Sequence, residues 1–154
     1  MSKKTVISLA VLILSPLIIY FLWPSDESRI KKLFREGAHA IELEKTDDVM
    51  SRVSFNYTDD KGLAYITIKE GIGRVFQQMS GIKIDYKIKK ITIKDKTATA
   101  DLDIRVIGSY GEDAGYAVGD AATPAHMKFF LEKERVKWLV SKTEGLPLGS
   151  ILNH

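Results

Sequence analysis

The sequence predicts an α+β fold, in which an N-terminal transmembrane helix precedes three helices packed on a bent antiparallel sheet. Residues 5–23 carry no charge and match the length of a membrane span. Apolar residues then recur at helical spacing as far as Met79, and from Ile82 onward they alternate with polar residues, as in strands with one buried face. The 154 residues suffice for one ordinary domain, so anchor and body account for the whole chain.

The composition excludes several classes of protein. Charged residues make up 28% and hydrophobic residues 45%, which is ordinary globular usage. No cysteine is present, which excludes disulfides, zinc ribbons and thiol nucleophiles, and three histidines leave little for a metal site. We therefore expect no metal and no cofactor. Without residues 1–23 the chain has 21 basic and 20 acidic residues, so we expect no nucleic-acid binding.

Residues 5–23, TVISLAVLILSPLIIYFLW, are predicted to be an uncleaved membrane anchor. At ~1.5 Å of rise per residue they nearly span a ~30 Å hydrocarbon core. Pro16 is tolerated in a membrane helix, while Tyr20 and Trp23 stand at the end where aromatic residues favour the interface. A cleaved signal peptide is the alternative, but its apolar core is shorter and small residues follow it.

The charges that flank the anchor predict its orientation. Lys3 and Lys4 precede it, and acidic residues follow it, so the positive-inside rule places the N-terminus in the cytoplasm. We expect a single-pass protein of the cell inner membrane with a periplasmic or extracellular soluble domain. The predicted parts are a cytoplasmic N-terminus (1–4), a transmembrane signal-anchor (5–23), the soluble domain (24–145) and a loose C-terminal tail (146–154).

Three helices are predicted in the first half of the body. Ser25 is a good N-cap for a helix that begins at about Asp26. Thr46 is predicted to cap a short second helix, which a brief strand at 54–57 follows. The third helix runs from about 63 to 79. The first helix has one apolar face, formed by Ile30, Leu33, Phe34, Ala38 and Ile41.

A β-hairpin with a bulge follows the third helix. The alternation slips by one residue after Ile88, which requires a β-bulge near Lys89 and Lys90. A turn at 95–96 then places residues of opposite charge opposite each other on the outer face, and this supports the pairing. The predicted pairs are Ile93 with Ala98, Lys90 with Asp101, Lys87 with Asp103, and Asp85 with Arg105.

A second hairpin ends the domain. Residues 108–123 are rich in Gly and Ala and are predicted to form a long loop or a distorted ribbon. The strand from Pro124 then turns at 134–135 and returns through Trp138 and Val140. The predicted pairs are Leu131 with Trp138, Phe129 with Val140, and Glu132 with Lys137.

This order of three helices and two hairpins, with a bulge in the first hairpin, resembles the NTF2-like (SnoaL-like, cystatin-like α+β) superfamily. There a bent sheet wraps around helices to form a cone. The segment LEKERVKWLVSKTEGL (131–146) resembles the last hairpin of such domains, and the chain is similar to small bacterial membrane-anchored members without assigned activity. The superfamily includes isomerases, dehydratases and pure binding modules, so the resemblance alone implies no single activity.

Five inward-facing side chains are the candidate ligand-binding residues. If the cone is open, they line a pocket, and their hydroxyls and indole N–H offer polar contacts; if it is filled, they form the core. They are Tyr57, Tyr65, Tyr86, Met127 and Trp138.

No catalytic residue is assigned. Asp85, Asp101, Asp103 and His126 point outward by strand parity, and only His39 with Asp47 or Asp48 imitates an acid–base pair. We therefore expect an extracytoplasmic, non-enzymatic domain that binds a small apolar ligand or a partner protein at the cell envelope. The alternative is an isomerase or dehydratase acting on a hydrophobic substrate, which needs a buried Asp, Glu or His in the pocket.

A weak homodimer is also expected, through the outer face of the sheet. Phe130 and Leu139 are predicted to lie opposite each other there, and Ile107 also faces outward. An exposed pair of apolar residues with a polar rim is a typical interface centre.

Overall fold

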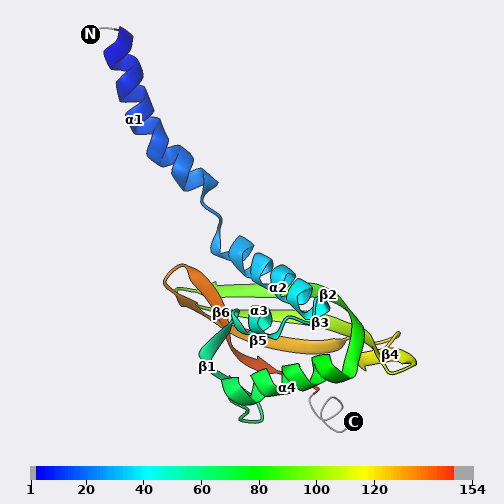
Figure 1. The fold of residues 1–154 in the computed structure, drawn as a ribbon. Coiled ribbons are helices and arrows are strands. Elements are labelled where there is room, and N and C mark those ends of the chain that lie inside the picture. Colours follow the sequence, from blue (N-terminus) through cyan, green and yellow to red (C-terminus); the bar gives the residue numbers. More distant parts are fainter. Residues whose placement is uncertain (1–2, 148–154) are drawn as a thin grey trace.

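The structure is a computed structural model and describes residues 3–147. A long helix, α1 (Lys3–Leu22), projects from a body in which a curved sheet wraps around three helices (Figure 1). The predicted α+β class is confirmed. The helices of the body are α2 (Asp26–Glu42), α3 (Thr46–Met50) and α4 (Tyr65–Gln78). The strands are β1 (Val53–Asp59), β2 (Met79–Lys94), β3 (Thr97–Tyr110), β4 (Asp113–Val118), β5 (Ala125–Glu134) and β6 (Lys137–Glu144).

α1 is a candidate membrane span. It is 20 residues long, contains Pro16 and has no buried residue. Of the helices in the described part of the chain, it alone is long and apolar enough to cross a membrane. Signal sequences share these properties, so the helix is compatible with both predicted alternatives.

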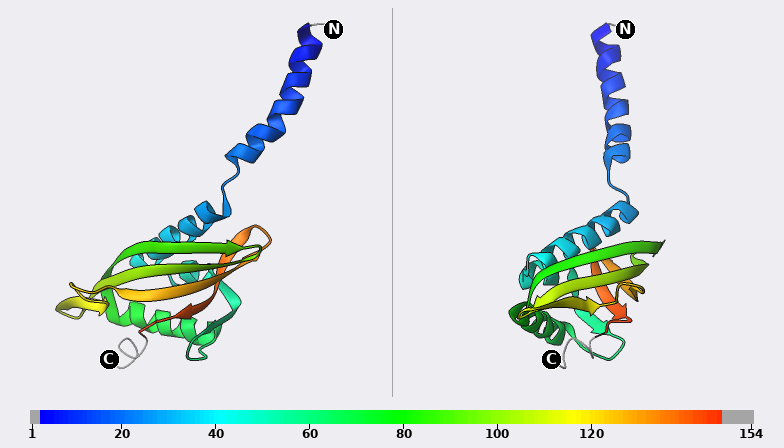
Figure 2. Two further views of the ribbon diagram at one scale, coloured as in Figure 1. Left: turned by 180° about the vertical axis from the view of Figure 1, so that it is seen from behind. Right: turned by 90° about the vertical axis from the view of Figure 1, so that its right-hand side faces the viewer.

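The sheet is mixed, and the predicted purely antiparallel sheet is wrong in this respect. The strand order is β1-β6-β5-β3-β2, and β4 pairs with β3. All neighbours are antiparallel except β1, which runs parallel to β6. No hairpin turn fixes the direction of β1, because α4 separates it from β2, and this freedom permits parallel pairing with a strand distant in sequence. The helices lie on one face of the sheet, and the other face is uncovered (Figure 2).

The first hairpin has the predicted register. Ile93 faces Ala98, and the three pairs of opposite charge form as expected. The ladder is irregular between Ile88 and Lys90, where the bulge was predicted. Asp95 occupies the turn with a φ of 54°, a left-handed conformation that Asp tolerates better than most residues.

The last hairpin is shifted by two residues from the predicted register. Leu131 faces Val140, and Trp138 faces Lys133, because the turn is at 135–136. From the turn to Leu131 the shift is two residues, which keeps these side chains on their predicted faces, and an irregularity between Phe130 and Leu131 adds a third residue of shift beyond it. In this register Lys133 forms an ion pair with Asp26 at 2.8 Å, a contact that the sequence pattern does not show. The other predicted pairs are also wrong: Phe129 faces Thr143, Phe130 faces Lys142, and Glu132 faces Leu139.

Three smaller expectations need adjustment. The Gly-rich segment 108–123 is partly regular, because β3 continues to Tyr110 and β4 pairs back on it, as in the predicted ribbon alternative. The third helix ends at Gln78, and β2 begins directly at Met79. Thr46 is the first residue of α3, and Lys45 is its N-cap. Ser25 caps α2 as predicted, since its hydroxyl accepts the backbone N–H of Ser28 at 3.2 Å.

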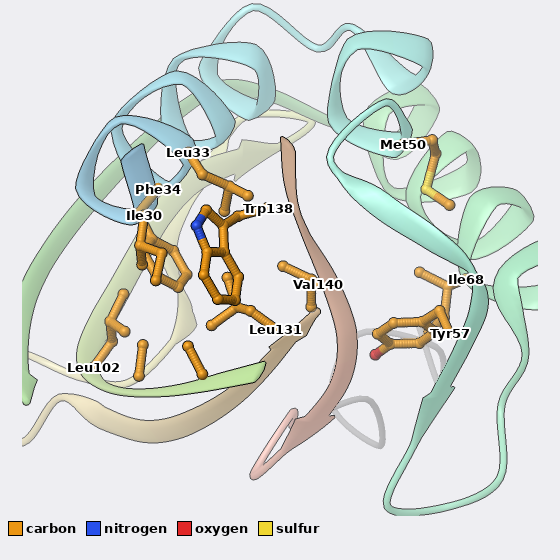
Figure 3. Close-up of a cluster of buried hydrophobic side chains, with 12 residues drawn as sticks. Ile30, Leu33, Phe34, Met50, Tyr57, Ile68, Leu102, Leu131, Trp138 and Val140 are labelled. Atoms are coloured by element: carbon orange, nitrogen blue, oxygen red, sulfur yellow. The ribbon is translucent and has the colours of Figure 1, made fainter. Parts of the chain in front are cut away.

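The core is packed between α2 and the middle of the sheet (Figure 3). Ile30 is fully buried, and the ring of Phe34 meets that of Phe129 edge to face, with 5.1 Å between centroids. Trp138 is buried at the centre and donates its indole N–H to Asp26 at 3.0 Å. Asp26 therefore closes the end of the core that lies nearest to α1.

Candidate functional site

A cavity of about 320 Å³ lies between the inner face of the sheet and the helices α2, α3 and α4. Its lining is almost wholly apolar, and its volume is at the lower end of the ~300–1,000 Å³ typical of ligand pockets. Typical lining residues are Leu33, Ile41, Ile72, Phe76, Ile84 and Val106.

Small residues on the two facing helices leave this space open. Gly37 and Ala38 face the cavity from α2, and Gly71 faces it from α4. Ile68 is the one residue of this helix that is buried, and the other large apolar residues that α4 adds to the lining, Ile72, Val75 and Phe76, are only half-buried. Native protein interiors are close-packed. An apolar helix face that points toward the sheet and is still only half-buried therefore indicates a pocket between the helix and the sheet.

Three of the five candidate ligand-binding residues line the cavity. These are Tyr57, Tyr86 and Met127. Trp138 does not, because it is part of the packed core. Tyr65 lies outside the cavity lining with its ring 4.8 Å from that of Phe55. Contact of these side chains with a ligand stays a prediction.

Tyr57 supplies the best-defined polar group of the cavity. Its hydroxyl forms a buried hydrogen bond with the hydroxyl of Thr143, which also lines the cavity. Burial raises the pKa of Tyr57, and the nearby carboxylates of Asp59 and Asp60 raise it further, against the opposing effect of Thr143. The phenol is therefore neutral at physiological pH and can donate a hydrogen bond.

Asp59 is a buried carboxylate that no pattern in the sequence singled out. Its Oδ1 accepts the backbone N–H groups of Lys61 at 2.9 Å and of Leu63 at 2.6 Å. Its Oδ2 is buried and has no hydrogen-bond partner in the described structure. Asp59 is not among the residues that line the cavity. Its contacts show that it shapes the turn before α4, as Asp commonly does in turns.

The described lining of the cavity contains no Asp, Glu or His. His39 is exposed, and no hydrogen bond or ion pair of the described structure joins it to Asp47 or Asp48. Asp47 instead forms an ion pair with Lys69 at 2.9 Å. The structure therefore does not assemble the acid–base pair that the sequence suggested.

The outer face of the sheet carries a second group of polar side chains. His126 lies between Asp101, at 3.5 Å, and Asp103, at 3.2 Å. The hydrogen bond from His126, together with Lys89, lowers the pKa of Asp103. Within the described residues, no group of His, Asp or Glu has an arrangement that could hold a metal ion.

The predicted centre of a dimer interface is not built as expected. Phe130 and Leu139 do not face each other, because of the register shift. The ring of Phe130 lies instead between two lysine ammonium groups, Lys142 at 5.2 Å and Lys128 at 5.9 Å from its centroid. Ile107 is exposed, as predicted. The homodimer itself stays a prediction.

Two arginines border the cavity and differ in their surroundings. Arg52 is held by the Glu36 carboxylate at 3.2 Å and by the carbonyl of Asp48. Arg74, on α4, is exposed and has no ion pair or hydrogen bond within the described part of the chain. Neither arginine stands out in the sequence, because its position at a cavity depends on how α3 and α4 pack.

No protein-family model matches the chain, and no curated protein matches it. Several solved structures are similar to the chain. A protein of unknown function with a cystatin-like fold from Nostoc punctiforme has a TM-score of 0.61 and 16% identity, covering 80% of this chain and 95% of its own. A protein from Novosphingobium aromaticivorans, provisionally assigned as a scytalone dehydratase, has a TM-score of 0.62 and 11% identity, covering 75% and 79%.

Another protein from Novosphingobium aromaticivorans, provisionally assigned as an aromatic ring hydroxylase, has a TM-score of 0.60 and 18% identity. The match covers 75% of this chain and 84% of that one. At these identities the similarity concerns the fold and carries no activity. The body of the chain therefore has the cystatin-like α+β fold of the NTF2-like proteins, which confirms the resemblance predicted from the order of its elements.

Proposed function

We propose that this protein is a membrane-anchored binding domain that holds a small apolar ligand in its cavity without acting on it chemically. The observation that carries the proposal is the cavity itself, whose described lining is apolar and contains no Asp, Glu or His. Isomerases and dehydratases need a group that takes up or donates a proton beside the substrate. An apolar wall with a few hydroxyl groups instead favours binding and orientation.

The proposed anchor is α1, with the body on the periplasmic or outer side of the inner membrane. The length and composition of α1 and the lysines before it support this. Only residues 23–25 separate α1 from α2. Arg29 lies over the ring of Trp23, at 5.5 Å, and donates to the carbonyl of Val136 at 3.0 Å. These contacts hold the body close to the end of α1, so the body would stay near the membrane.

The test uses the full chain in lipid nanodiscs and the neutral apolar dye N-phenyl-1-naphthylamine. We expect saturable fluorescence enhancement above that of empty nanodiscs. Ala38→Phe fills the cavity from α2 and should abolish the saturable part. The matched control is Ala114→Phe, on the exposed part of β4, which should bind as the wild type does.

Equal dye binding by wild type and Ala38→Phe would contradict the proposal. Circular dichroism verifies that the variant is folded. Ile72→Trp, which fills the cavity from α4, gives the same answer independently.

An enzyme is the second candidate, and one observation favours it. Tyr57 lines the cavity, and when Thr143 is the donor in their hydrogen bond, the neutral phenol can donate to a substrate carbonyl, which is a way to stabilise developing negative charge. In that case Tyr57→Phe would lower turnover and leave dye binding unchanged. A binding module has no turnover to lose.

A further inference from the structure

We propose that the ligand of the cavity is an amphiphile with one acyl chain and an anionic head group, a carboxylate or a phosphate, and that Arg74 binds the head group. This inference rests on the proposed function and specifies its ligand class. It follows from the charges on the lining, from the position of Arg74 and from the shape of the apolar wall.

The described lining contains positive charge and no acidic residue. Arg52 is already neutralised locally by Glu36 and has donated hydrogen bonds to backbone and side-chain oxygens nearby. Arg74 has no such partner. Glu70, one turn earlier on α4, is at the spacing of a helical ion pair, yet the two residues form no ion pair in the structure. Arg74 is thus an arginine at the cavity whose charge is available to a ligand.

Arg74 marks the rim of the cavity. A side chain that both lines a cavity and is exposed lies where the cavity meets solvent, and Thr67 on the same helix has the same property. A guanidinium at the rim binds carboxylate or phosphate with paired hydrogen bonds and leaves the rest of the ligand inside. Inside the cavity the ligand meets apolar surface, and the polar groups described there are the hydroxyls of Tyr57 and Thr143.

An acyl chain fits this interior better than a compact polar ligand. The wall that α2, α4, β2 and β3 form consists mainly of aliphatic and aromatic side chains, and the charged residues of the lining are Arg52, which Glu36 neutralises, and Arg74. A polar ligand would lose its hydration without new partners, whereas a methylene chain gains by leaving water. The ligand is therefore oriented with its chain inside and its charge at Arg74.

The experiment compares two photoreactive lipids on the full chain in nanodiscs of neutral phosphatidylcholine. One is palmitic acid with a diazirine on its chain, and the other is the corresponding alcohol. Crosslinked peptides are mapped by mass spectrometry. We expect the acid to label cavity-lining peptides about tenfold more than the alcohol at equal concentration, the ratio of one charged hydrogen-bonded pair.

Arg74→Gln should remove this preference and leave labelling by the alcohol unchanged. The matched control is Arg35→Gln, because Arg35 is also an exposed helical arginine without a partner in the described structure and does not line the cavity. It should keep the preference for the acid.

The outcomes separate the two proposals. Equal labelling of the cavity by acid and alcohol overturns the anionic head group and leaves the proposed function in place. Labelling that Ala38→Phe does not reduce overturns both. Competition by lysophosphatidic acid and by free palmitic acid, compared at equal concentration, distinguishes a phospholipid source from a free fatty acid; failure of both to compete counts against the inference.

Discussion

The two ends of the same sheet differ in how they are filled. The end nearest α1 is solid, because Trp138 and Ile30 are buried there, and the packed rings of Phe34 and Phe129 separate this core from the cavity that they border. The end beneath α4 is hollow, although its strands have the same alternation of apolar and polar residues. The difference arises in the helices, where large residues face the sheet at one end and Gly37 and Gly71 face the hollow at the other.

The alternation of apolar and polar residues therefore indicates which face of a strand or helix points inward, but it does not indicate whether that face is closely packed. Packing depends on summed side-chain volume across two elements, which is a tertiary property. Stability and binding are then expected to reside in different ends of the molecule.

Removal of an aromatic side chain should be far more costly at the solid end. Trp138→Ala is expected to lower the free energy of unfolding by about 3–5 kcal/mol, because it deletes a buried ring and leaves a new cavity. Phe76→Ala, at the hollow end, should cost less than half as much, since Phe76 is half-buried and already faces empty space. Chemical unfolding of the full chain in detergent micelles measures both. Equal losses would show that the two ends are packed alike.

Asp26 should contribute to stability in a pH-dependent way. Hydrogen bonds from Lys133 and Trp138, with the charge of Lys133, lower the pKa of Asp26 below its ordinary value. Because the folded pKa is the lower one, the ionised carboxylate stabilises the folded state fully above the unfolded pKa of about 4, and this contribution is lost as the pH falls through the folded pKa. Asp26→Ala should cost about 1–3 kcal/mol at pH 7, since the buried indole N–H of Trp138 loses its partner.

The measurement is the difference in unfolding free energy between wild type and Asp26→Ala from pH 7 to pH 2.5. This difference in unfolding free energy should decrease only at the acidic end of the range, where Asp26 becomes protonated in the folded protein. Glu27→Ala is the matched control, because it also removes a carboxylate from the first turn of α2 but breaks only an exposed pair with Lys31. A pH-independent difference for Asp26→Ala would refute the role of its charge.

Gly73→Ala should stabilise the protein slightly. Gly73 lies inside α4, and an added Cβ would meet no atom within 4 Å. Alanine is favoured over glycine in a helix by roughly 0.5–1 kcal/mol, so the midpoint of unfolding should rise accordingly. Gly108→Ala is the contrasting variant, because its Cβ would overlap the buried side chain of Met79. A loss of stability in Gly73→Ala would show that α4 has no room on that side.

The first hairpin could be predicted in detail because local signals agree there. Its turn, its bulge and three pairs of opposite charge are all readable within 85–105, and together they permit one register. The last hairpin lacked such agreement. A turn one residue earlier satisfies the same alternation. In the observed register Lys133 pairs with Trp138, and both contact Asp26 on α2, which is more than a hundred residues earlier and outside any local pattern.

The sequence alone was sufficient to predict the apolar N-terminal helix, the start of α2, the inward faces of the strands and the fold that their order implies. Each depends on periodicity, capping or charge within a short stretch of chain. Tertiary structure alone decided that β1 runs parallel to β6, that Trp138 is core while Tyr57 and Tyr86 line a cavity, and that Arg74 stands at its rim. Those outcomes depend on which distant elements meet and on the volume left between them, and a one-dimensional pattern does not contain that information.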